Sequence, residues 1–112
     1  MKQCKPCEGG VGLLSKEEAL RSLRGLSGWL LSADEKAIHI DYVMKDFRAA
    51  VALIDRMARL AEKEGHHPDI HLTGYRKLRV ELSTHAIGGL SENDFILAAK
   101  IDKLPKTFKT SS

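Results

Sequence analysis

The stretch from residue 62 to residue 75, EKEGHHPDIHLTGY, gathers side chains suited to proton transfer. It contains His66, His67 and His71, three of the five histidines in the chain. Imidazole is the side chain whose ordinary pKa lies nearest neutral pH, so this cluster indicates general acid–base chemistry. Glu62 lies four residues before His66, and at that spacing a carboxylate can hold an imidazole in one tautomer if the helical path continues through the turn.

The corner that carries these histidines is stiff. Pro68 fixes its own φ angle and pushes His67 into an extended conformation. Adjacent histidines on an extended corner point apart, so His66 and His67 suit two tasks better than one metal ion. His85 follows a strand pattern, beside Ser83 on the polar side, and strand ends are where a sheet-based site collects its side chains. The sequence therefore predicts a histidine-rich acid–base pocket.

Metal binding and purely structural roles are the alternatives. Four of the histidines would be enough donors for zinc, but their spacing matches no compact zinc motif, and HHPDIH is not HExxH. We therefore expect no metal. Asp94 has a complete structural explanation as the capping partner of Ser91, and Tyr75, in a predicted hairpin turn, is more often a packing residue than a ligand.

The two cysteines form a CxxC pair, Cys4 and Cys7, in a Gly-flanked segment. A redox motif of this kind works at a helix N-terminus that follows a strand, and no strand pattern precedes this one. We expect a flexible arm over 1–12 whose thiols are incidental; a structural zinc shared with histidines is the remaining alternative. A flexible tail is expected at 106–112, which leaves a single domain at 13–105.

The composition is that of an ordinary globular domain, with 43% hydrophobic and 29% charged residues in 112. No apolar run approaches the roughly 18 residues of a membrane span, and no signal-peptide pattern is present. The formal charge of +3 is mild and the charges alternate in sign, so we expect neither membrane nor direct nucleic-acid binding. We predict a cytoplasmic protein, small enough to have a nuclear fraction as well.

The elements that must position these side chains follow the order α-β-β-α-β-β-α. Ser15 with Glu18, and Ser91 with Asp94, have capping-box spacing, which predicts two helix starts. Apolar residues recur at helical spacing over 46–64, ahead of a glycine stop. Alternating or apolar stretches predict four strands, at 28–32, 37–43, 69–73 and 77–84. We predict an α+β fold with a four-stranded antiparallel sheet and the helices packed on one face.

The run FILAA at 95–99 makes the last helix apolar on more than one side. Such a helix must bury its second side, and in a chain this small we expect a second subunit to cover it. This predicts a homo-oligomer, either a dimer or a tetramer.

The chain resembles the pterin-4a-carbinolamine dehydratases in three separated motifs: E-x3-H-H-P from Glu62, STH ending at His85, and GLSEND ending at Asp94. Tyr75 and the weaker pairs at 28–29 and 46–47 extend the resemblance. It implies a hydro-lyase that needs no metal or organic cofactor. Its substrate would be the 4a-hydroxytetrahydropterin left by aromatic amino-acid hydroxylases, and its product the quinonoid dihydropterin of tetrahydrobiopterin recycling.

The resemblance also implies residue roles. His66 and His85 would protonate the departing hydroxyl, His67 would contact the pterin, and Glu62 would orient a histidine. The catalytic set is therefore His66, His67, His85 and Glu62, and the substrate-binding set is His67, Pro68, Ile70, His71, Tyr75, Ser83, Thr84 and Asp94.

Two departures and one alternative accompany the resemblance. Ile70 stands where animal members carry a tryptophan, and the stretch from Pro68 to His85 is one residue longer, as in plant, microbial and protist forms. Animal members also act as dimerisation cofactors for a homeodomain transcription factor, so an interaction protein is the alternative function. A pure partner-binding module has no use for the full histidine set, which favours the enzyme.

Overall fold

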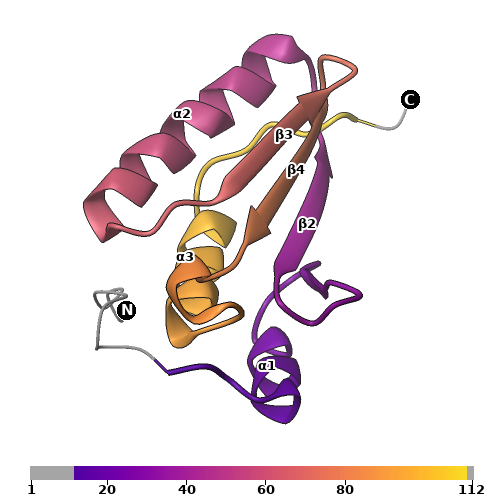
Figure 1. Ribbon diagram of the computed structural model, residues 1–112. Coiled ribbons are helices and arrows are strands. Elements are labelled where there is room, and N and C mark those ends of the chain that lie inside the picture. Colours follow the sequence, from indigo (N-terminus) through magenta and orange to yellow (C-terminus); the bar gives the residue numbers. More distant parts are fainter. Residues whose placement is uncertain (1–11, 111–112) are drawn as a thin grey trace.

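The structure is a computed structural model that describes residues 12–110 (Figure 1). The predicted arm with Cys4 and Cys7 therefore lies outside the described residues, Gly12 excepted. The predicted α+β order is confirmed, with one short 3-10 helix added before the last helix. In chain order the elements are α1 (Lys16–Leu23), β1 (Leu30–Leu31), β2 (Ile38–Val43), α2 (Phe47–Glu64), β3 (Asp69–Thr73), β4 (Lys77–Leu82), η1 (His85–Ile87) and α3 (Glu92–Asp102).

Local side chains set the helix ends. The Ser15 hydroxyl accepts a hydrogen bond from the Glu18 N–H at 3.2 Å, and the Glu18 carboxylate accepts one from the Ser15 N–H at 2.9 Å. Asp46 caps α2 by accepting a hydrogen bond from the Ala49 N–H at 2.8 Å. Gly65 ends α2 in the left-handed region at φ 68°, which a side chain would strain. The predicted start of α1 and stop of α2 are therefore confirmed.

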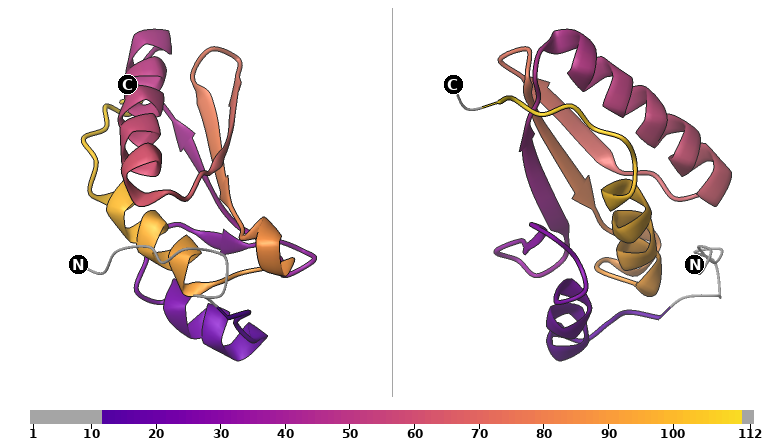
Figure 2. Two further views of the ribbon diagram at one scale, coloured as in Figure 1. Left: turned by 60° about the vertical axis from the view of Figure 1, so that its left-hand side comes forward. Right: turned by 180° about the vertical axis from the view of Figure 1, so that it is seen from behind.

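The four strands form one antiparallel sheet in the order β1-β2-β4-β3. Ile40 lies opposite Val80, and Val80 lies opposite Ile70, so the apolar side chains of three strands share one face. Helices α2 and α3 lie on that face, and α1 lies beside α3 (Figure 2). The resulting core combines strand residues with Leu53 of α2 and Leu97 of α3, both fully buried. No helix within 12–110 has the length and apolar character needed to cross a bilayer.

The FILAA run of α3 is covered inside the chain. Its first four side chains, Phe95 to Ala98, are all buried. Leu26, in the segment after α1, lines the same groove as Phe95 and Ile96. The expectation that a second subunit must cover this helix is wrong, because these four side chains are already buried within the single chain. Exposed apolar side chains occur on several elements, and two of them, Phe47 at 55% and Val51 at 45%, lie four residues apart on α2.

The segment after α3 runs back beside the end of β2. The Lys45 N–H donates to the Thr107 carbonyl at 3.0 Å, and the Lys109 N–H donates to the Val43 carbonyl at 3.0 Å. The stretch predicted as a flexible tail is thus hydrogen-bonded to the chain as far as Lys109. The boundaries of the arm, the domain and the tail remain predictions.

Candidate active site

His66 leaves α2 immediately after Gly65 and is buried, with 5% of its surface exposed. Its Nε2 lies 2.6 Å from Oδ1 of Asp94, which is fully buried in the first turn of α3. The pair considered from the sequence, Glu62 with His66, is not formed. The left-handed Gly65 ends the helical path, so His66 turns away from α2 and toward α3.

Asp94 combines the capping role with a histidine contact. Its Oδ2 accepts hydrogen bonds from the Ser91 N–H and the Thr84 hydroxyl, each at 2.9 Å, while Oδ1 faces His66. The Thr84 and Ser91 hydroxyls are buried and lie 2.8 Å apart. A carboxylate held by several donors keeps one position, and it therefore holds the imidazole in one orientation. The capping role alone is an incomplete account of Asp94.

Glu62 pairs with the second histidine. Its Oε2 lies 2.5 Å from Nε2 of His67, and the two side chains are 76% and 62% exposed. A carboxylate in the last turn of a helix faces the negative end of the helix dipole. The hydrogen bond to His67 offsets the unfavourable interaction of Glu62 with the helix dipole. An exposed pair of this kind nevertheless contributes at most about 1 kcal/mol to stability. Orienting His67 on the solvent side is the clearer consequence.

His85 is exposed at the start of η1 and lines a pocket of about 260 Å³. Ser83 and Thr84 lie on the same side, while Asp34 and Lys36 line the pocket from the β1–β2 turn. Thr84 thus joins the pocket wall to the buried aspartate. Asp34 and Lys36 were not predicted as site residues, because they lie in the connection between the strands expected at 28–32 and 37–43. The sequence shows that both residues lie just before the strand that became β2. This position indicates a place beside Ser83 and His85 only when the pairing of β2 with β4 is known.

Three predicted binding residues lie apart from this group. Ile70 is half-buried on the helix-facing side of β3, and His71 is on the opposite face, 3.9 Å from Glu81. Tyr75 lies in the hairpin turn with φ 54° and is 57% exposed. Pro68 is half-buried and lies just before β3, at the end of the strand away from Tyr75. The five residues of β3 span about 17 Å at roughly 3.4 Å per residue.

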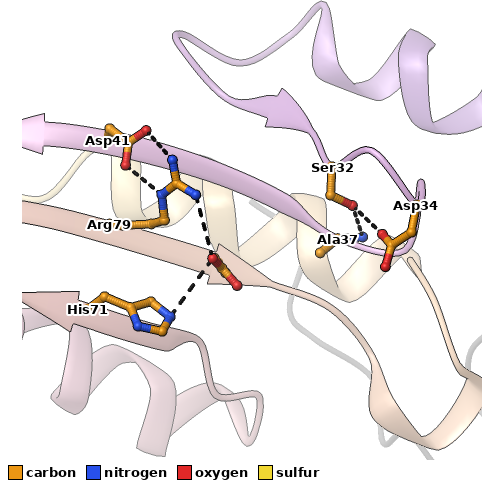
Figure 3. A network of polar contacts seen from close by, with 7 residues as sticks. Ser32, Asp34, Ala37, Asp41, His71 and Arg79 are labelled. Atoms are coloured by element: carbon orange, nitrogen blue, oxygen red, sulfur yellow. Dashed lines mark hydrogen bonds and ion pairs between the residues drawn. The ribbon is translucent and has the colours of Figure 1, made fainter.

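His71 belongs to a polar network on the open face of the sheet (Figure 3). There Arg79 donates to both carboxylate oxygens of Asp41, at 2.7 and 2.9 Å. These hydrogen bonds lower the pKa of the Asp41 carboxyl and raise the pKa of Arg79. All of these groups are partly exposed, and none of them lines the His85 pocket.

Two histidines of the candidate site each lie within hydrogen-bond distance of a carboxylate. Within residues 12–110, no three His, Cys, Asp or Glu side chains come close enough together to hold a metal ion. His66 faces Asp94 and His67 faces Glu62. Such pairs suit hydrogen bonding and proton transfer.

Comparison with known proteins assigns the family. The family profile described as "Pterin 4 alpha carbinolamine dehydratase" matches residues 12–104. The chain belongs to the pterin-4a-carbinolamine dehydratase family. The family predicted from the sequence motifs is therefore confirmed, and with it the hydro-lyase class. All of the candidate site residues lie within the matched range.

Individual relatives agree with the family. A Nitrosospira multiformis protein to which pterin-4-alpha-carbinolamine dehydratase activity is ascribed is 50% identical over 103 residues, or 92% of this chain and 88% of that protein. Arabidopsis thaliana "Pterin-4-alpha-carbinolamine dehydratase 2, mitochondrial" is 42% identical over 106 residues, 92% of this chain and 57% of that protein. A crystal structure of a "transcriptional coactivator/pterin dehydratase" from Brucella melitensis superposes with a TM-score of 0.76 at 33% identity, over 80% of this chain and 95% of that one.

Proposed function

We propose that this protein removes water from a 4a-hydroxytetrahydropterin to give the quinonoid dihydropterin, using histidines as proton donors and acceptors. The observation that carries the proposal is the 2.6 Å contact between His66 and Asp94, in a buried network that reaches the His85 pocket through Thr84. Membership of the family supports the substrate class. The proposal uses no metal and no organic cofactor, and it places the reaction in the cytoplasm.

The reaction breaks the bond between C4a and the hydroxyl oxygen and moves two protons. One imidazolium protonates the hydroxyl, which leaves as water. A ring N–H gives its proton to a neutral imidazole, and the electron pair of that bond forms the new C=N bond. We assign these two proton transfers to His85 and His66, with Asp94 orienting His66. His67, held by Glu62, is assigned to pterin binding.

The first experiment follows the dehydration of freshly prepared 4a-hydroxytetrahydropterin by ultraviolet absorbance, after dialysis against chelator. We expect the wild type to accelerate the reaction and His85→Ala to lose about 10²–10⁴-fold of that rate. His39→Asn is the matched control, because His39 lies in β2 outside the pocket, and we expect it to keep the wild-type rate.

Two results would overturn the proposal. One is a folded wild type that does not exceed the spontaneous rate. The other is a loss in His39→Asn as large as that in His85→Ala, since the rate would then depend on histidine content and not on the pocket.

We also propose that the protein self-associates, through α2 and not through α3. Phe47 and Val51 are exposed there and line a shallow hollow together with Ala52. The same surface supports the alternative of an interaction protein, since the Brucella relative is described as a transcriptional coactivator as well as a pterin dehydratase. Self-association buries these side chains without any further partner, and we favour it for that reason.

A further inference from the structure

The β1–β2 turn forms one wall of the His85 pocket. Ile38 pairs with Leu82 in the sheet, so the residues just before β2 lie beside those just after β4. Asp34 therefore lines the same pocket as Ser83 and His85, although about fifty residues separate them in sequence. The pocket lining thus includes a carboxylate from the β1–β2 turn beside the residues that follow β4.

Hydrogen bonds within the turn hold this carboxylate in place. Asp34 Oδ1 accepts from the Ser32 hydroxyl at 2.6 Å (Figure 3). It also accepts from the Lys36 N–H at 3.0 Å. The Ser32 oxygen in turn accepts from the Ala37 N–H at 3.1 Å. The Ser32 bond first, and then the Lys36 bond, lower the pKa of the Asp34 carboxyl, so it is ionised at neutral pH. Both bonds from other residues go to Oδ1, which leaves Oδ2 for a ligand.

We infer that Asp34 recognises the pyrimidine edge of the pterin, with Oδ2 accepting hydrogen bonds from the 2-amino group and the neighbouring N3–H. This inference rests on the proposed function and adds the residue that orients the substrate. Two adjacent N–H donors are complementary to an ionised oxygen with two lone pairs. The pocket volume of about 260 Å³ is close to the lower end of ligand pockets, which suits one small bicyclic ring.

The chemistry of the ring gives this orientation a catalytic meaning. In the pyrimidine ring of a pterin, C4a lies directly across from C2, which carries the amino group. A pterin held at its amino edge by Asp34 therefore points C4a away from Asp34 and toward the rest of the pocket lining, which includes His85. Lys36 lines the pocket as well, but within residues 12–110 it forms no ion pair with Asp34, so the carboxylate is available to the substrate.

The test uses Asp34→Asn, which retains an oxygen for the two turn bonds and places an NH2 group where Oδ2 was. Glu35→Gln is the matched control, since it removes one charge from the same turn, and Glu35 pairs with Lys16 at 3.2 Å and does not line the His85 pocket. Affinity is measured by fluorescence titration with 6-methyl-7,8-dihydropterin and with its analogue lacking the 2-amino group. Melting temperatures verify that each variant folds, and Asp34→Ala replaces Asp34→Asn if the latter does not.

We expect Asp34→Asn to weaken dihydropterin binding by at least about 10-fold, because a donor then faces the donor edge. Binding of the desamino analogue should change by less than about 3-fold, and Glu35→Gln should leave both affinities within about 3-fold of wild type. In turnover, Asp34→Asn should raise KM more than it lowers kcat.

Unchanged dihydropterin binding in Asp34→Asn would overturn the inference, and so would an equal loss for both ligands. Because binding is read without turnover, this result is separate from the proposed function. An active wild type with an unaffected Asp34→Asn overturns only the role of Asp34, whereas a wild type that does not accelerate dehydration overturns the proposed function.

Discussion

At the residue scale, the two carboxylate oxygens of Asp94 contact different partners. Oδ1 lies beside His66, and Oδ2 accepts hydrogen bonds from Ser91 and Thr84. The side chain is fully buried. A buried carboxylate is tolerated only when hydrogen-bond donors surround it, and here they do. The arrangement therefore ties the start of α3 to the orientation of one imidazole.

Asp94→Asn should separate the two roles of this side chain. The amide has one acceptor oxygen and one NH2 group, so it must disrupt one side of the network. We expect unfolding to become easier by about 1–3 kcal/mol and kcat to fall by at least about 10-fold, because the imidazole loses its fixed position. Urea unfolding and the dehydration assay measure the two effects.

Asp46→Asn is the control for Asp94→Asn, since Asp46 also caps a helix but lies at the start of α2, far along the chain from Gly65. It should change stability by no more than about 1 kcal/mol and leave kcat at the wild-type value. If Asp94→Asn likewise lowered stability without lowering kcat, Asp94 would be a helix cap only.

At the scale of elements, the last turn of α2 and the last turn of α3 are joined by an ion pair. Lys100 Nζ lies 2.9 Å from Oε2 of Glu64, and the side chains are 15% and 3% exposed. The pair joins α2, which ends two residues before His66, to α3, which carries Asp94. Removing one partner of such a pair leaves a buried charge, whereas replacing both by apolar residues is often neutral.

Lys100→Met should therefore lower the free energy of unfolding by about 2–4 kcal/mol, because Glu64 loses its ammonium partner. The double variant Glu64→Leu/Lys100→Met should recover most of that loss. Lys103→Met, an exposed position just past α3, is the control and should remain within about 0.5 kcal/mol of wild type. A double variant less stable than Lys100→Met would show that the ion pair itself stabilises the fold.

At the scale of the whole molecule, α2 is amphipathic but not fully covered. Its buried side carries Leu53 and Met57, whereas Phe47 and Val51 remain exposed. Apolar side chains grouped on one helix surface indicate contact with another protein surface. Other exposed apolar side chains, such as Leu20 of α1 and Leu30 of β1, lie on separate elements.

Phe47→Glu should shift the protein toward the monomer, because it places a charge in the proposed interface. Sedimentation velocity of the wild type should give a mass above the 12.4 kDa of one chain. Leu20→Glu, on the exposed part of α1, is the control and should leave the assembly unchanged. A monomeric wild type, or an assembly that Phe47→Glu does not weaken, would argue against self-association through α2.

Sequence alone determined the elements and the family. The caps at Ser15 and Ser91 and the stop at Gly65 are local features, because each depends on hydrogen bonds within a few residues. Strand positions follow from alternation, which reflects the period of an extended chain. The motifs from Glu62 to Asp94 indicate the family because residue identity and spacing can be read from the chain without knowledge of its packing.

Only the tertiary structure decided which groups meet. Gly65 turns the chain after α2, so Asp94 and not Glu62 faces His66. Pairing of β2 with β4 brings Asp34 to the His85 pocket, because a turn and a strand end distant in sequence share one edge of the sheet. Packing within the single chain buried the apolar run that had suggested a second subunit. Each outcome depends on contacts between distant segments, and periodicity carries no information about such contacts.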